Sequence, residues 1–147
     1  MRPITGEIFV RAPVEEVFDF VADESNEPLY NTNMLRAEKL TPGPIGVGTR
    51  FAAVMKGRSP TALTIEYTGL NRPRTLSSRS RTAGMEIEGE LTFVPEGNGT
   101  RLRWVWRLHP YGALRFLIPL VRAIGSRQER ANWSGLKSYL EAAPKTA

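Results

Sequence analysis

The sequence predicts an α+β fold in which a curved, seven-stranded antiparallel sheet wraps around one long C-terminal helix. Short stretches of alternating apolar and polar residues fill most of positions 4–109, with turn residues between them. One much longer helical pattern follows, from Leu114 to Glu141. A sheet with one apolar face needs a covering layer, and this helix is the only predicted element long enough to supply it.

The N-terminal segment predicts a strand and two short helices. Ile4–Arg11 has the composition of a strand. Pro13–Ala22 is expected to form a short amphipathic helix, because proline is favoured at the first helical position and apolar residues follow at helical spacing. Ser25 is expected to cap a second short helix over 26–30.

Six further strands are expected between residues 34 and 109. Clusters of Gly, Pro, Asn and Ser separate them, and the short, regular spacing favours antiparallel hairpins. The predicted strands are 34–41, 49–56, 61–70, 74–82, 85–94 and 100–109.

The last predicted hairpin shows the clearest alternation. Its inward positions should carry the apolar side chains, and the outward positions should pair Arg with Glu across the strands. The inward set on the final strand is Leu102, Trp104, Trp106 and Leu108, and the outward set is Arg101, Arg103 and Arg107.

The long helical pattern predicts one face toward the sheet and one toward solvent. Pro119 is expected either to kink this helix or to mark a late start. The inward stripe is expected to be Leu117, Val121, Ile124, Gly125, Gln128, Asn132, Gly135, Leu136 and Tyr139. The glycines leave room for close sheet packing or for a ligand.

Composition excludes several classes of function. With 147 residues the chain fits one domain, expected over 1–142, with a loose tail over 143–147. The absence of Cys excludes disulfides and thiolate chemistry, and a single histidine excludes a multi-His metal site. No signal peptide or membrane-spanning run is evident, so a cytoplasmic protein is expected. The net charge of +5 comes from scattered arginines, so no specific nucleic-acid partner is predicted.

Three motifs resemble those of a known superfamily. They are the opening Ile8–Pro13 with Glu15–Asp23 and Asn26–Pro28, the segment Gly46–Phe51, and the ending Asn132–Glu141. Their order and spacing resemble the START and birch-pollen-allergen-like superfamily, also called SRPBCC, in its polyketide cyclase/dehydrase and lipid transport-like branch. The resemblance implies a helix-grip fold with a cavity between sheet and helix, and no universal catalytic motif.

Seven residues are candidates for ligand binding, because they place polar or aromatic groups on predicted inward positions. Each also has a structural interpretation: the two tryptophans as core, the hydroxyls as a polar edge, and the amides as groups bonded to sheet backbone or water. The candidates are Tyr67, Ser78, Ser80, Trp104, Trp106, Gln128 and Asn132.

No catalytic residue, metal site or cofactor is predicted. His109 is expected at a solvated strand end, and Glu7 and Asp19 on the surface. The sequence shows no nucleophile motif, no phosphate-binding glycine loop and no evident acid–base pair.

Three functions remain open from the sequence. The favoured one is binding of a small, largely apolar, lipid- or polyketide-like ligand in the cavity. The second is a polyketide cyclase or dehydratase, in which His109 or a cavity Tyr would move protons, and which a His or a carboxylate facing the cavity would favour. The third is a protein-interaction or membrane-surface role of residues 111–127, including a homodimer through the C-terminal helix, for which Phe116 and Leu120 should be exposed.

Overall fold

The structure, a computed structural model, describes residues 2–142, and the predicted tail over 143–147 lies outside them. Its elements follow the predicted order of strand, short helices, six strands and long helix. They are β1 (Ile4–Val10), α1 (Val14–Ala22), the 3₁₀ helix η1 (Glu24–Leu29), β2 (Met34–Lys39), β3 (Arg50–Met55), β4 (Thr61–Asn71), β5 (Thr75–Arg81), β6 (Met85–Glu96), β7 (Gly99–Pro110), the 3₁₀ helix η2 (Gly112–Leu117) and α2 (Ile118–Ala142).

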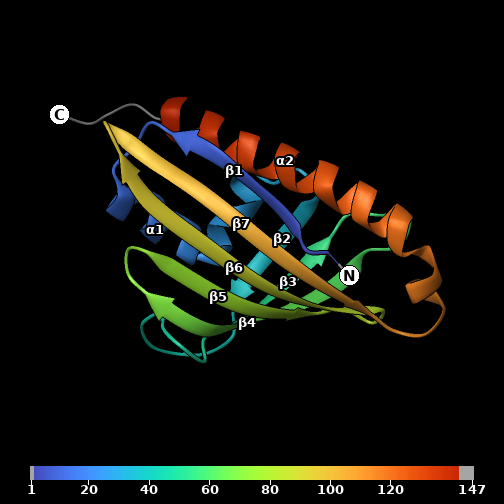
Figure 1. Cartoon of the computed structure of the whole chain (residues 1–147). Helices are drawn as coiled ribbons and strands as arrows, with labels where there is room; N and C mark the ends of the chain where they lie inside the picture. Colours follow the sequence, from blue (N-terminus) through green and yellow to red (C-terminus); the bar gives the residue numbers. More distant parts are fainter. Residues whose placement is uncertain (1, 143–147) are drawn as a thin grey trace.

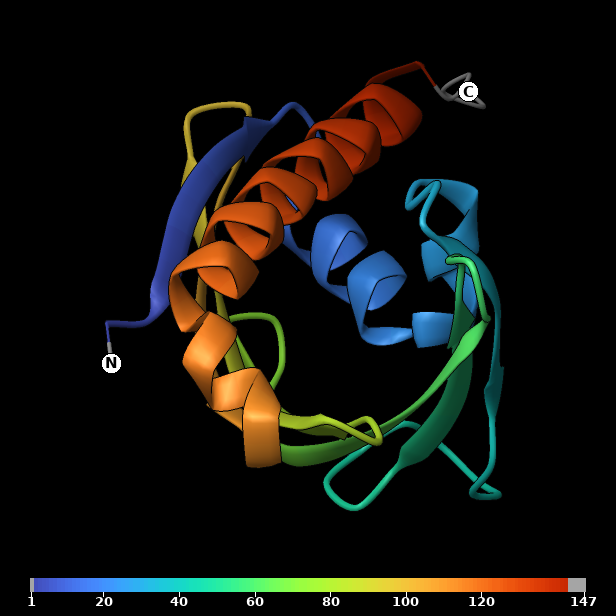
Figure 2. The ribbon, with the colours of Figure 1, turned by 90° about the vertical axis from the view of Figure 1, so that its right-hand side faces the viewer.

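The seven strands form one antiparallel sheet in the order β1-β7-β6-β5-β4-β3-β2, which confirms the predicted fold (Figure 1). The sheet curls strongly, and α2 runs across its open side beside β1 (Figure 2). The helices α1 and η1 lie on the same concave side of the sheet (Figure 2). These helices therefore face the inner surface of the sheet, and no helix within residues 2–142 covers the outer surface.

The predicted alternation in β7 is confirmed. Leu102 and Trp104 are buried, Trp106 is half-buried on the same face, and Arg103 and Arg107 are exposed. The outer face carries the expected cross-strand ion pairs, because opposite charges stand side by side on neighbouring strands. Examples are Arg103 with Glu7 at 2.9 Å, Arg101 with Glu96 at 2.9 Å and Arg79 with Glu86 at 3.1 Å.

The structure corrects the predicted cap of the second short helix and decides between the two predicted roles of Pro119. The second short helix begins at Glu24, and its cap is Asp23, whose carboxylate accepts a hydrogen bond from the Ser25 N–H at 3.1 Å. Ser25 is therefore not the cap, because Asp23 offers an acceptor two residues earlier. Pro119 marks a late start, since the residues before it form η2 and α2 begins at Ile118.

The inward stripe of α2 is rotated relative to the prediction. The residues buried on α2 are Asn132, Trp133, Leu136 and Leu140, and Glu129 continues the same face one turn earlier. Leu117, Ile124 and Tyr139, expected inside, are exposed. The helix lies obliquely beside β1 and leaves one flank of its apolar surface open. The predicted exposure of Phe116 and Leu120 is confirmed, at 77% and 57%.

The concave side has a packed half and a hollow half. Near α1, the Phe18 and Phe93 rings meet edge to face at 5.0 Å, and Val10, Leu76 and Leu102 belong to the same buried core. The cavity lies toward the opposite end, between the start of β6, the end of β7 and the middle of α2. A single helix cannot fill the whole width of a curved sheet, so the half that α1 does not reach remains open.

Candidate functional site

The cavity between the sheet and α2 has a volume of about 370 Å³. Ligand pockets in proteins usually have volumes of about 300–1,000 Å³. Its wall is mostly apolar, with aliphatic and thioether side chains from several strands of the sheet and from α2. These are Ile4, Met34, Met55, Leu63, Ile65, Met85, Ile87, Leu91, Leu108, Val121 and Ile124.

Five of the seven predicted site residues line this cavity: Ser78, Ser80, Trp106, Gln128 and Asn132. The other two do not. Tyr67 is buried, and its hydroxyl donates to the Ala22 carbonyl at 2.5 Å. Trp104 is buried in the packed half and stacks on Trp133 at 5.7 Å.

The two helix amides occupy different positions at the cavity. Gln128 was expected to be buried, but it is exposed, as is its neighbour in the wall, Ile124. The mouth of the cavity therefore lies along this flank of α2. Asn132 is only 6% exposed, and its Nδ2 donates to Glu27 Oε1 at 3.2 Å. Its Oδ1 is buried without a hydrogen-bond partner.

Three carboxylates that the sequence analysis did not select also line the cavity: Glu24, Glu27 and Glu129. Glu24 and Glu27 stand three residues apart on η1, and side chains at this spacing eclipse in a 3₁₀ helix. They therefore project from the same face of η1. Glu129 faces them from α2, on the opposite wall.

Each carboxylate is held by neutral hydrogen-bond donors. Glu129 Oε2 accepts from the indole N–H groups of Trp106 at 2.8 Å and Trp133 at 2.9 Å. Glu27 Oε1 accepts from Asn31 at 3.1 Å as well as from Asn132. Glu24 Oε1 receives a long contact from the Tyr67 hydroxyl, at 3.4 Å, and the Glu24 carboxyl also lies within hydrogen-bond reach of the Glu27 carboxyl. Glu24 Oε2 is buried without a hydrogen-bond partner.

Burial and mutual repulsion disfavour the charged form of this cluster. Burial, followed by the nearby charge of Glu27, raises the pKa of Glu24 well above its ordinary value. Burial and Glu27 also raise the pKa of Glu129 to about 7, against the opposing effect of the two indole donors. The Tyr30 hydroxyl borders the same carboxylates, and its pKa is raised by burial and by Glu27.

No Lys, Arg or His stands in the cavity wall within residues 2–142. Nor does this part of the chain contain a group of three or more His, Cys, Asp or Glu side chains positioned to hold a metal ion. The charged groups that face the cavity are therefore all acidic, and their partners in the protein are all neutral.

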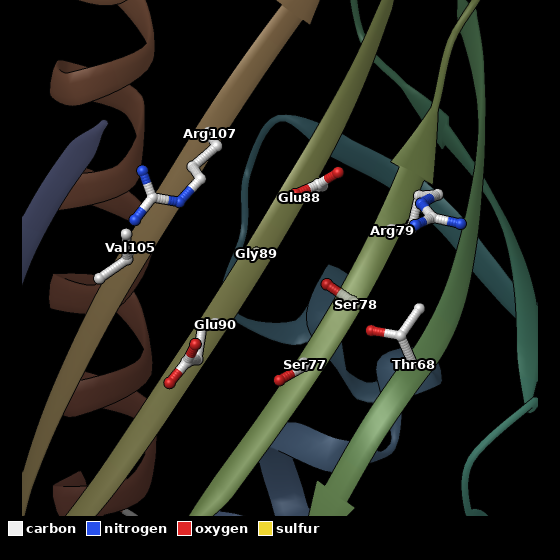
Figure 3. A pocket seen from close by; sticks show the side chains of 9 residues that line it. All are labelled: Thr68, Ser77, Ser78, Arg79, Glu88, Gly89, Glu90, Val105 and Arg107. Carbon is white, nitrogen blue, oxygen red and sulfur yellow. The ribbon is translucent and has the colours of Figure 1, made fainter. Parts of the chain in front are cut away.

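A second pocket, of about 270 Å³, lies on the outer face of the sheet and has a different character (Figure 3). Arg79 and Arg107 stand beside Glu88 and Glu90 there, so acidic and basic groups balance. This pocket resembles the ordinary charged surface of an antiparallel sheet.

One glycine on the sheet supports the position of Trp106, which donates a hydrogen bond to Glu129. Gly89 stands opposite Trp106 in the β6–β7 register, and the indole lies directly over it. A Cβ at Gly89 would come within 1.7 Å of the Trp106 ring. The missing side chain thus lets Trp106 lie across the sheet and direct its N–H to Glu129.

The missed carboxylates left only a partial signal in the sequence. Glu129 lies four residues after Gly125, three before Asn132 and four before Trp133, which is the spacing of one helix face. The predicted stripe was centred one position away, on Gln128. Glu24 lies outside the helix that was expected over 26–30, so its shared face with Glu27 became visible only in the structure.

The arrangement defines a class of protein: helix-grip folds that enclose a cavity between a curved sheet and a C-terminal helix. The family model for polyketide cyclase/dehydrase and lipid transport matches residues 1–141. The chain belongs to this family, within the SRPBCC superfamily.

Solved structures of the same fold cover nearly the whole chain. The ZhuI aromatase/cyclase from Streptomyces sp. R1128 has a TM-score of 0.82 at 15% identity, covering 95% of this chain and 93% of its own. A START superfamily protein from Mycobacterium smegmatis has a TM-score of 0.81 at 13% identity, covering 96% and 98%. TTHA0849 from Thermus thermophilus has a TM-score of 0.81 at 19% identity, covering 96% and 99%. No curated protein sequence matches the chain.

Within the described residues, no helix is both long and apolar enough to cross a membrane.

Proposed function

We propose that this protein binds a small, largely apolar ligand in the cavity between the sheet and α2. The carrying observation is the cavity itself, whose wall is aliphatic over most of its area and polar at one end. Ser78, Ser80 and Trp106 on the strands, with Gln128 and Asn132 on α2, would contact the ligand. Tyr67 and Trp104 would support these residues from behind.

The expected affinity is modest. Burying about 200 Å² of apolar ligand surface contributes on the order of 5 kcal/mol before the costs of association. The mouth beside Gln128 gives such a ligand a route of entry that requires no opening of the sheet. Micromolar binding or weaker is therefore expected for a purely apolar compound.

A cyclase or dehydratase is the second candidate, and the carboxylates favour it. A carboxyl with a pKa of about 7, as for Glu129, can both donate and accept a proton near neutral pH. Glu129 would exchange the proton with a bound polyketide-like substrate, and the cavity would hold that substrate folded. Conversion of a polyketide-like substrate that is lost on substitution of Glu129 would favour an enzyme over a binding protein.

Filling the cavity tests the proposed function. Ile87 lines the cavity from β6, so Ile87→Trp should occupy ligand space. Thr64→Trp, at an exposed position of β4, is the matched control. With naphthylmethanol as the neutral apolar probe, calorimetry should detect binding to the wild type and to the control, and at least about tenfold weaker binding to Ile87→Trp. Equal binding to all three would place the probe outside the cavity and refute the proposal.

A further inference from the structure

We infer that the ligand of this cavity carries a protonated amine on its apolar body, and that Glu24, Glu27 and Glu129 hold the ammonium group. The inference rests on the proposed function, because it names the class of ligand that the same cavity would take. Two observations support it. The three carboxylates line one end of the cavity, and the buried polar atoms without a partner in this wall are oxygen atoms that can accept hydrogen bonds.

The three carboxylates surround one end of the cavity from two sides. Glu24 and Glu27 project from η1, and Glu129 projects from α2, held in place by two indole N–H groups. All three belong to the cavity wall, whose residues in the described chain include no cationic side chain. A buried carboxylate is costly unless a positive charge or several hydrogen-bond donors compensate it. The described wall of the cavity supplies no positive charge to compensate these carboxylates.

The unpartnered buried atoms in this wall point to the same conclusion. They are Asn132 Oδ1 and Glu24 Oε2. The amide oxygen of Asn132 is always an acceptor, and the Glu24 oxygen is an acceptor when its carboxyl is ionised. Asn132 is 6% exposed, so its oxygen depends on a donor from within the cavity. Three of the nearby donors are already engaged, since Trp106 and Trp133 bond to Glu129 and Asn31 bonds to Glu27. A primary ammonium group supplies three donors and no acceptor, which complements this set.

The rest of the wall favours an organic cation over a metal ion. Within residues 2–142, no group of three or more His, Cys, Asp or Glu side chains is positioned to hold a metal ion. Most of the space beside the acidic end is bounded by aliphatic side chains, which suit an apolar body. The aromatic rings of Tyr30, Trp106 and Trp133 also border the cavity, and aromatic faces attract organic cations.

A matched series of probes tests the charge requirement. Naphthylmethylamine, naphthylmethanol and naphthoate share one apolar body and differ in carrying a positive, a neutral or a negative group. Calorimetric titration at about pH 8, above the Glu129 pKa, should give the tightest binding for the amine. Charge-assisted hydrogen bonds predict a preference over the alcohol of roughly ten- to hundredfold, with the naphthoate weakest.

Variants that remove one carboxylate charge test whether the preference for the amine depends on these glutamates. Glu27→Gln and Glu129→Gln should each reduce amine affinity about tenfold and change alcohol affinity by less than about threefold. Glu16→Gln, at an exposed position of α1, is the matched control and should bind like the wild type.

The outcomes separate the inference from the proposed function. If the alcohol or the naphthoate binds as tightly as the amine, or if the Gln variants keep the full amine preference, the inference is overturned and the binding cavity stands. If none of the three probes binds, both the proposed function and the inference are overturned.

Discussion

Carboxylates on the two sides of this sheet meet opposite surroundings. On the outer face Glu7, Glu86 and Glu96 each pair with an arginine on a neighbouring strand, at 2.9–3.1 Å. On the inner face Glu24, Glu27 and Glu129 line a cavity whose described wall contains no basic residue. The outer acids are paired with arginines of the protein, and the inner acids have no cationic partner in the described wall.

The difference appears in the protonation behaviour of the two sets. Arg101 lowers the pKa of Glu96 on the outer face. Burial and neighbouring acid raise the pKa of Glu24 and Glu129 on the inner face. The outer acids thus contribute little beyond surface complementarity. The inner acids make the folded protein less stable when ionised, which is the pattern expected of a site that a ligand completes.

The largest effect is expected from Gly89→Ala, which breaks the support of the inner cluster. The added methyl would collide with the Trp106 ring, and moving that ring would remove one of the donors to Glu129. Urea unfolding should show a loss of about 3 kcal/mol. Gly69→Ala on β4 is the control, because its new methyl would only touch Ser77 at 3.4 Å. Equal stability of the two variants would show that Trp106 can leave Gly89 freely.

Glu129→Gln should stabilise the free protein, in contrast to most substitutions of buried polar groups. The folded-state pKa of about 7 lies above the ordinary 4.5, so wild-type stability falls as pH rises from about 4.5 to about 7. The variant lacks this loss and can still accept the indole hydrogen bonds through its amide oxygen. At pH 8 it should be about 2 kcal/mol more stable than the wild type.

Measuring the free energy of unfolding of both proteins as a function of pH tests that prediction. The difference between the two proteins should shrink toward zero below about pH 5, where Glu129 is increasingly protonated in both folded and unfolded states. A constant difference across this range, or a destabilised variant at pH 8, would contradict a raised Glu129 pKa in the folded protein.

Asn132→Leu should have a smaller effect on stability and a selective effect on binding. The change removes one donor from Glu27 and one free acceptor from the cavity. Stability should fall by about 1 kcal/mol, because Glu27 keeps its bond from Asn31. Naphthylmethylamine should lose about tenfold in affinity and naphthylmethanol much less. Parallel losses for both probes would indicate that the leucine simply reshapes the cavity.

The smallest effect is expected on the outer face. Glu96→Gln removes the partner of Arg101 from an exposed ion pair, and such pairs are screened by water and salt. Thermal unfolding at pH 8 should be nearly unchanged, and raising the salt concentration should abolish any remaining difference. A large loss would show that the outer pairs are more than surface complements.

The strands were predictable because their alternation is local and strict. Trp104 and Trp106 could be placed on the inner face from their phase alone. The phase does not distinguish core from cavity, however, and Trp104 packs in the core while Trp106 lines the cavity. That distinction depends on where α1 ends along the sheet, which is a tertiary feature.

The polar end of the cavity was harder to predict. An acidic residue on a helix usually faces solvent, so the sequence does not mark Glu129 as a site residue, although its spacing to Asn132 and Trp133 places it on the buried face. Glu24 and Glu27 become neighbours of Glu129 only when the fold brings the 3₁₀ helix η1 and the helix α2 to the wall of the same cavity. Sequence distance between residues 27 and 129 gives no indication of that contact.

The most direct test of the account is the titration of Glu129 followed by carboxyl-detected NMR, with and without naphthylmethylamine. The free protein should show a Glu129 carboxyl with a pKa of about 7. Bound amine should lower that pKa, because the ammonium group stabilises the carboxylate, and affinity should rise with pH through the same range. A Glu129 pKa near 4.5 in the free protein, unchanged by the amine, would contradict the claim that the cavity holds uncompensated acids for a cationic ligand.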